Sequence, residues 1–171
     1  PLRLARPGDA PGLARDGRVG WTRRQAIGTL VGAASLLAGP RRGRAATPPL
    51  RLRLAFIGVG GKGNGAVKSL TDHHFVAFAD VDERQATATF AEFPAVPRYR
   101  DFRAMLDRHH REIDGVVISA PDHLHHPMAI AALQLGKHVY LEKPLASTIW
   151  ECRQLQIAAA ARPNVRTQMG I

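Results

Sequence analysis

The chain of 171 residues has little cysteine, no visible internal repeat and only a short apolar, alanine-rich stretch near its N-terminus. Its single cysteine, Cys152, excludes an internal disulfide and fits a protein that folds in a reducing cytosol. No repeat of about 20 to 50 residues is visible, which excludes solenoids and propellers. The apolar, alanine-rich stretch over residues 27–39 is too short to cross a bilayer as a helix.

Acidic residues are scarce in the first third of the chain. Residues 1–53 hold 11 of the 24 lysines and arginines but only two of the 14 acids, whereas residues 54–171 hold 13 basic and 12 acidic residues. The formal net charge of +10 therefore belongs almost wholly to the N-terminal segment. Because the rest of the chain is nearly neutral, it does not predict a nucleic-acid-binding surface.

The basic segment has the layout of a bacterial twin-arginine export signal. Arg23 and Arg24 precede the apolar stretch, which has the length of a signal core, and residues 41–46 are basic and small. We therefore expect residues 1–46 to be a leader, disordered or cleaved. The twin-arginine translocation machinery would then deliver the protein to the periplasm or outside the cell. The alternative is a disordered leader around a short amphipathic helix.

The strongest motif follows this leader. An apolar strand over residues 52–57 runs into a loop of the form G-x-G-x-x-G, which is a dinucleotide-binding fingerprint. The first glycine permits a tight turn, the second lets the backbone approach a pyrophosphate, and the third lets the next helix pack on the strand. The phosphates would lie on the N-terminus of that helix. The predicted pyrophosphate-binding residues are Gly58, Gly60, Gly61, Lys62 and Gly63.

An acidic residue about 20 positions further on completes the fingerprint. Asp80 supplies it at the end of a second apolar strand, residues 75–79. Its carboxylate would accept both ribose hydroxyls of NAD and repel the 2′-phosphate of NADP, so NAD is the predicted cofactor. Arg84 keeps NADP as the second candidate. An ordinary flexible turn, the alternative for the glycines, is disfavoured because strand, loop, helix, strand and acid fall in order.

Apolar strands alternate with helical patterns beyond the fingerprint. This alternation predicts parallel βαβ units, and so a doubly wound, Rossmann-like α/β sheet over residues 50–171, with enough chain for one domain. The expected strands are residues 52–57, 75–79, 98–99, 115–119, 137–141 and 165–169. The expected helices are residues 63–70 and 83–93, one from Asp101 to His109, one with Pro127 in its first turn that ends at Gly136, and one capped by Ser147 that ends at Ala161.

Two polar segments follow the fourth and fifth strands, at the carboxyl ends where ligands of such sheets bind. The first runs from Ser119 to Pro127 and contains three histidines, at positions 123, 125 and 126. A metal site there is disfavoured, because no cysteine is near and a cofactor loop is expected, so no metal is predicted. The second segment is Glu142-Lys143-Pro144. The alternative to a functional role for this segment is that Glu142 and Lys143 form a solvated ion pair at the end of the strand.

The glycine loop, Asp80 and these two segments together resemble the Gfo/Idh/MocA family, the glucose-fructose oxidoreductase and inositol dehydrogenase group of nicotinamide-dependent enzymes. The resemblance covers residues 51–170. It implies hydride transfer between a sugar or cyclitol carbon and the nicotinamide, with Lys143 as the catalytic residue near the reacting hydroxyl. Since a residue before proline is extended, Lys143 would project into the cleft. The cofactor-contacting residues that the resemblance implies are Ser119, Pro121, Asp122, His125, Glu142 and Lys143; Asp122 stands where the family usually has Asn.

The resemblance also implies a second, substrate-binding domain that is not in these 171 residues. We expect the chain to be the NAD(P)-binding part of a longer exported oxidoreductase, inactive alone, with any homo-oligomer formed through that second domain. One alternative is an NAD-dependent glycosidase of the same fold, which acts by oxidation and elimination. The other is a truncated, non-catalytic nucleotide-binding fragment.

Overall fold

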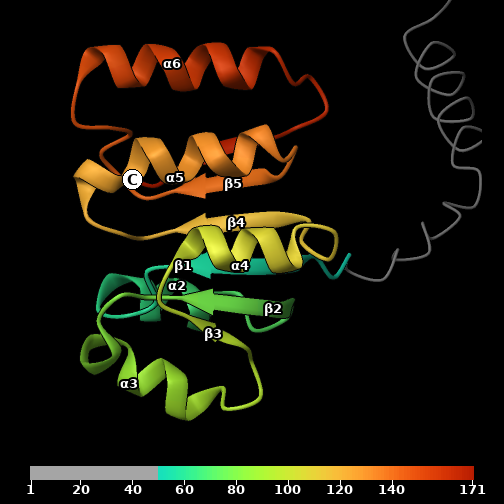
Figure 1. Ribbon diagram of the computed structural model, residues 1–171, viewed down its shortest axis with the longest axis vertical. Helices are drawn as coiled ribbons and strands as arrows, with labels where there is room; N and C mark the ends of the chain where they lie inside the picture. Colours follow the sequence, from blue (N-terminus) through green and yellow to red (C-terminus); the bar gives the residue numbers. More distant parts are fainter. Residues whose placement is uncertain (1–49) are drawn as a thin grey trace, which may run out of the picture. The chain divides into compact units, whose positions relative to one another are not determined.

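A parallel sheet of six strands runs through residues 50–171, the part of the chain that the computed structural model describes (Figure 1). The strands lie in the order β3-β2-β1-β4-β5-β6, and every neighbouring pair is parallel. Their bounds are β1 (Arg53–Ile57), β2 (His74–Ala79), β3 (Arg98–Tyr99), β4 (Gly115–Ile118), β5 (His138–Leu141) and β6 (Thr167–Met169). The Rossmann-like α/β fold predicted from the alternating pattern is confirmed. The predicted leader, residues 1–46, lies outside the described residues.

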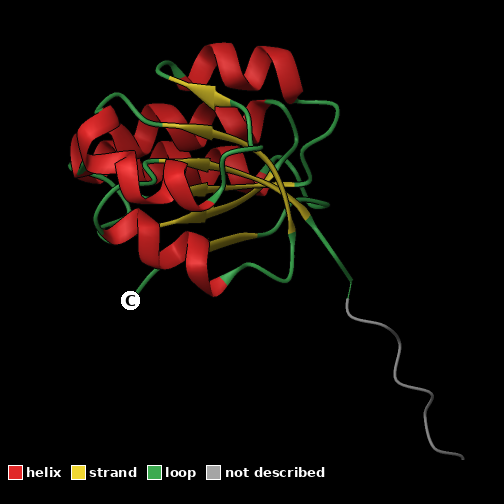
Figure 2. Cartoon of the chain, turned by 90° about the horizontal axis from the view of Figure 1, so that it is seen from below, coloured by secondary structure: helices red, strands yellow, loops and turns green. Residues whose placement is uncertain are grey.

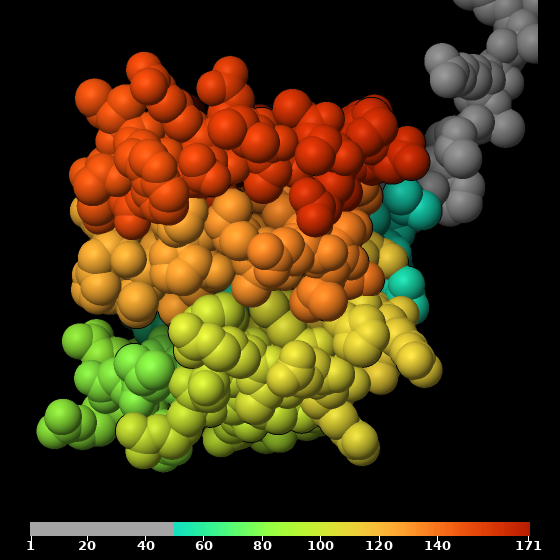
Figure 3. Space-filling view, turned by 45° about the horizontal axis from the view of Figure 1, so that its top comes forward, coloured from blue at the N-terminus to red at the C-terminus, as the bar shows by residue number. Residues whose placement is uncertain are grey.

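Helices cover both faces of the sheet (Figure 2). Their bounds are α2 (Lys62–Ser69), α3 (Glu83–Glu92), α4 (Phe102–His109), α5 (Asp122–Gln134) and α6 (Ile149–Ala160). Helices α2 and α3 contact each other on one face, whereas α4, α5 and α6 contact one another in series on the other. Figure 3 shows this second face, where the later part of the chain, yellow to red, forms a continuous layer.

Two hydrophobic clusters hold these layers on the sheet. One lies under α2 and α3 and includes Phe56 and Phe78, whose rings pack edge to face with centroids 5.7 Å apart. The other lies under α4, α5 and α6 and includes Met105 and Leu133. The central strand β4 is buried along its whole length. Burial on both faces explains why such strands are continuous apolar runs in the sequence.

Two predicted helix starts were wrong. Helix α5 begins at Asp122, so Pro127 lies inside it and not in its first turn. A proline inside a helix removes one backbone hydrogen bond, but α5 continues because residues beyond it, such as Met128 and Leu133, are buried against the sheet. Helix α6 is capped by Thr148 and not by Ser147.

Thr148 forms a capping box with Glu151. The Thr148 hydroxyl accepts from the Glu151 N–H at 3.2 Å, and the Glu151 carboxylate accepts from the Thr148 N–H at 2.9 Å. This T-x-x-E spacing is a known helix-start signature and was available in the sequence. Among the described residues, no helix is long and apolar enough to cross a membrane.

Candidate functional site

The glycine loop leaves β1 where the strand order reverses, with β2 on one side and β4 on the other. Open α/β sheets bind ligands outside the carboxyl ends of their strands at such a point. Gly58 has a φ of 78°, which a side chain would strain, and its N–H donates to the Ala79 carbonyl oxygen at 2.8 Å. A Cβ on Gly58 would lie 2.6 Å from the Ser119 carbonyl oxygen. The loops after β1 and β4 therefore meet only because residue 58 is glycine.

The other two fingerprint glycines are places of close backbone approach. A Cβ on Gly63 would collide with the Gly58 carbonyl, which agrees with the predicted close packing of the helix on the strand. A Cβ on Gly60 would lie 2.8 Å from the backbone of Gln85 in α3. Gly60 is thus required by a neighbouring helix as well as by the predicted approach of a pyrophosphate. The contact with Gln85 is not visible in the sequence, because it depends on how α3 packs.

Asp80 holds the glycine loop through its carboxylate. Its Oδ2 accepts from the N–H groups of Val59 at 2.8 Å and Gly60 at 3.1 Å, and its Oδ1 accepts from the Asp82 N–H at 2.9 Å. Hydrogen bonds to an ionised group are stronger than those between neutral groups. Asp80 therefore joins the loop after β1 to the start of α3, in addition to its predicted contact with the ribose.

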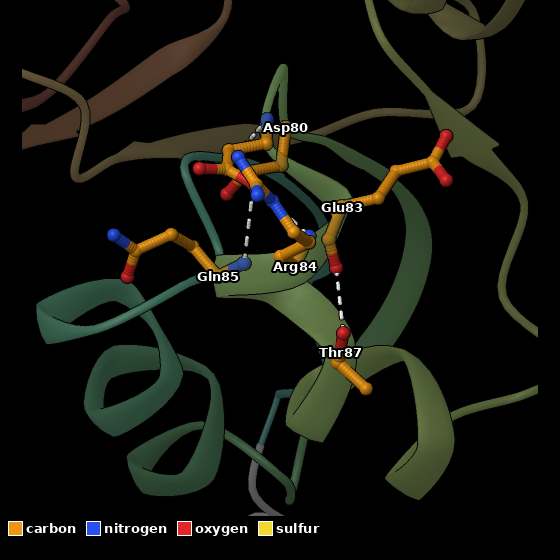
Figure 4. Close-up of polar contacts among 6 residues, drawn as sticks. Asp80, Glu83, Arg84, Gln85 and Thr87 are labelled. Carbon is orange, nitrogen blue, oxygen red and sulfur yellow. Dashed lines mark hydrogen bonds and ion pairs between the residues drawn. The ribbon is translucent and has the colours of Figure 1, made fainter.

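The start of α3 supplies side chains beside Asp80. Asp82 caps this helix by accepting from the N–H of Arg84 at 3.0 Å. Figure 4 shows Gln85 and Glu83 projecting in opposite directions, with the Arg84 side chain on the side of Asp80. The Arg84 side chain is 96% exposed and its Nε lies 3.8 Å from the Asp82 carboxylate. It can therefore move towards a phosphate bound near Asp80.

A cleft of about 390 Å³ lies between the loops that follow β1, β2 and β4. This volume is within the range of small-molecule sites. Of the residues predicted from the sequence, the cleft is lined by Gly58, Gly60, Gly61, Asp80, Ser119 and Pro121. The other lining residues are Ile57, Ala79, Val81, Asp82, Gln85, Arg100, Phe102, Ala120, Leu124 and Met128. Arg100 and Phe102 were available as signals, because they follow the expected third strand at its carboxyl end.

His125 was predicted to line the cleft, and that prediction was wrong. Its side chain is 1% exposed and lies beneath the loop after β4. The ring Nε2 is 2.8 Å from the Ala120 carbonyl oxygen, and Nδ1 is 2.6 Å from the Pro144 carbonyl oxygen. Asp122 is exposed at the first position of α5 and does not line this cleft.

Glu142 and Lys143 follow β5 but differ in environment. Glu142 is 8% exposed, and its carboxylate lies 3.4 Å from the Tyr140 hydroxyl. Burial first, and then the negative charge of Glu142, raise the pKa of Tyr140 above its usual value. Lys143 is exposed and forms no ion pair within residues 50–171, so the Glu142–Lys143 ion pair is not present. Glu142 and Lys62 instead line a second cavity of about 720 Å³ on the α2 face.

The three histidines that follow β4 lie near the start of α5, and their side chains have different surroundings. Within the described part of the chain, no group of three or more His, Cys, Asp or Glu residues has a metal-binding arrangement. The His126 ring lies 5.6 Å from the Trp150 ring of α6, whereas the His125 ring lies between two carbonyls.

A parallel sheet with a reversed strand order, a glycine loop at the reversal and an acid at the end of β2 define a dinucleotide-binding Rossmann domain. A family model confirms this class over residues 52–170 and is described as the Gfo/Idh/MocA oxidoreductase family, NAD-binding Rossmann fold. The chain belongs to this family. Its predicted cofactor, NAD, is therefore confirmed.

Similar proteins include both dehydrogenases and glycoside hydrolases. A glycosyl hydrolase family 109 protein of Shewanella pealeana is 36% identical over 61% of this chain and 25% of its own length. Inositol 2-dehydrogenase 1 of Saccharopolyspora erythraea is 30% identical over 71% of this chain and 37% of its own. The crystal structure of myo-inositol 2-dehydrogenase from Lactobacillus plantarum is 29% identical, with a TM-score of 0.65, over 71% of this chain and 36% of its own. The chain thus spans between a quarter and 37% of the length of these relatives.

Proposed function

We propose that this chain is the NAD-binding part of an exported oxidoreductase that transfers a hydride between a sugar or cyclitol and nicotinamide. The observation that carries the proposal is the cleft that gathers the glycine loop, Asp80 and the loop after β4 around one volume. Lys143 follows the next strand of the sheet, β5, at the same edge. The similarity to inositol dehydrogenases supports a polyhydroxylated substrate.

The residues of the cleft fit a dinucleotide. The Gly58 and Gly63 positions keep the loop close to the sheet, and the N-terminus of α2 offers backbone N–H groups to a pyrophosphate. Asp80 supplies the carboxylate for the adenosine ribose hydroxyls. Bound NAD supplies the hydride acceptor. In this proposal the Lys143 amine, exposed after β5, takes the proton of the reacting hydroxyl.

NAD is expected to stabilise the 171-residue chain against heat. At a concentration of about 100 times the Kd, binding adds about 2.7 kcal/mol to the free energy of unfolding, which for a domain of this size raises Tm by roughly 10 °C. NADP should raise it less, because Asp80 faces its 2′-phosphate. Differential scanning fluorimetry measures both shifts, with nicotinamide mononucleotide as the control that lacks the adenosine. A chain whose Tm responds to neither dinucleotide would refute the proposal.

For export, we propose the twin-arginine route, on the basis of Arg23, Arg24 and the apolar stretch that follows. Replacing both arginines by lysine in the full chain fused to a reporter should abolish its appearance in the periplasm. The matched control replaces Arg41 and Arg42 by lysine, which makes the same change outside the motif and should leave export intact. Undiminished export of the Arg23→Lys, Arg24→Lys protein contradicts the proposed route.

A glycosidase is the second candidate, because several similar proteins carry that name. One is the alpha-N-acetylgalactosaminidase of Shewanella oneidensis, 36% identical over 116 residues. The two activities leave different products: a dehydrogenase accumulates NADH with an inositol, whereas the glycosidase releases phenol from an aryl N-acetylgalactosaminide with no net NADH. Because the chain is expected to be inactive alone, both products are sought with the longer protein that we propose. Binding of NAD by that longer protein with neither product favours the third candidate, a non-catalytic nucleotide-binding fragment.

A further inference from the structure

The buried His125 ring joins two loops that are distant in the sequence. Its Nε2 is 2.8 Å from the Ala120 carbonyl oxygen in the loop after β4, and its Nδ1 is 2.6 Å from the Pro144 carbonyl oxygen in the loop after β5. Ala120 lines the cofactor cleft, and Pro144 directly follows Lys143. The ring thus lies between the cleft wall and the segment that carries the proposed catalytic lysine.

Both partners of the ring are carbonyl oxygens, which can only accept hydrogen bonds. A neutral imidazole has one N–H, so its other nitrogen would direct a lone pair at a carbonyl oxygen less than 3 Å away. Turning the ring over would not help, because C–H groups would then face oxygens at distances well below the about 3.3 Å of normal C–H···O contacts. Two N–H groups satisfy both contacts, and their short lengths fit hydrogen bonds from a charged donor.

The position of Lys143 depends on its backbone. Its side chain is exposed and has no hydrogen bond or ion pair with any residue of the described range 50–171. The neighbouring Pro144 carbonyl, by contrast, has a buried partner in His125. A displacement of that carbonyl would move residue 143 with it.

We propose that His125 is a positioning residue whose ring, with both nitrogens protonated, ties the Ala120 carbonyl to the Pro144 carbonyl and so sets the place of Lys143 relative to the cofactor cleft. The proposal rests on the proposed function for the roles of the cleft and of Lys143. The hydrogen-bonding state of the ring is a property of the chain itself.

Nitrogen NMR of the full 171-residue chain with 15N-labelled histidine tests the state of the ring directly. Both His125 ring nitrogens should give signals of protonated nitrogen, each coupled to a proton protected from solvent exchange. The His125→Gln variant assigns the signals by their loss, and backbone correlations assign them if that variant does not fold. One protonated and one bare nitrogen on His125 would overturn the proposal.

A second measurement follows the Lys143 amine. The rate of its reductive methylation, compared with that of Lys137 in the same sample by mass spectrometry, should change about threefold or more in His125→Gln, and the affinity for NAD should fall about tenfold, as expected for the loss of one strong hydrogen bond. His123→Gln is the matched control, since His123 is exposed on the same helix, and should change neither. Unchanged Lys143 methylation in a folded His125→Gln variant contradicts the positioning role.

The two proposals fail separately. If the wild-type chain binds no dinucleotide but its His125 ring shows two protonated nitrogens, the proposed function is refuted. The proposed hydrogen bonds of His125 to the Ala120 and Pro144 carbonyls then still stand. If the chain binds NAD but the His125 ring shows one bare nitrogen, the proposed function still stands and the proposed role of His125 is refuted.

Discussion

Replacing Asp80 by alanine should weaken NAD binding by about 100-fold or more and lower the free energy of unfolding by about 2–4 kcal/mol. Two effects combine in this one change. The carboxylate accepts three backbone N–H groups, from Val59, Gly60 and Asp82, and all three lose their partner. The predicted contacts with the ribose hydroxyls are lost as well. The effect is expected to be large because the same side chain shapes the loop and is predicted to contact the ligand.

Isothermal titration calorimetry with NAD and urea unfolding measure the two effects. Asp72→Ala is the matched control, because Asp72 is an exposed acid that does not line the cleft, so it removes the same charge without touching the loop. It should leave NAD affinity unchanged. Asp80→Asn removes the negative charge but keeps a side-chain oxygen that can accept hydrogen bonds from the loop. This variant should have a smaller ratio of NAD affinity to NADP affinity than the wild type. Wild-type affinity for NAD in Asp80→Ala would show that Asp80 is not part of the cofactor site.

The sequence predicted the elements of the fold well because their signals are local. Strands β1, β2 and β4 contain continuous apolar runs. The residues that follow these runs are Gly58, Asp80 and Ser119, respectively. The glycine fingerprint is equally local, since three spacings within one loop encode its turn and its packing. Such features depend on neighbours in the sequence, so no tertiary information is needed to find them.

The features that the sequence missed depend on distant contacts. Pro121 lines the cleft, but His125, four positions on, turns into the interior, where two carbonyls from different loops meet. Arg100 and Phe102 line the cleft because β3 pairs with β2 and α4 contacts both strands. Neither arrangement follows from spacing along one segment. Polar residues at strand ends can be listed from the sequence, but the direction of each side chain is set by the tertiary packing.

Gly63→Ala should destabilise the domain by about 3 kcal/mol and abolish NAD binding at concentrations that saturate the wild type. The added methyl group would overlap the Gly58 carbonyl, which is backbone and cannot rotate away as a side chain can. Either α2 moves off the sheet or the loop after β1 moves, and both displace the N–H groups that are proposed to bind the pyrophosphate. The change is therefore expected to affect stability and binding together.

Gly65→Ala gives the matched control within the same helix. A Cβ on Gly65 has nothing within 4 Å, so the substitution should stabilise α2 by about 0.5–1 kcal/mol through the higher helix propensity of alanine. Urea unfolding and NAD titration of both variants compare one added methyl group at two positions two residues apart. If the close approach of helix and strand shapes the cofactor site, the two substitutions change stability in opposite directions and only Gly63→Ala loses NAD. Equal stability and equal NAD affinity in the two variants would mean that the third glycine of the fingerprint does not hold α2 against the loop.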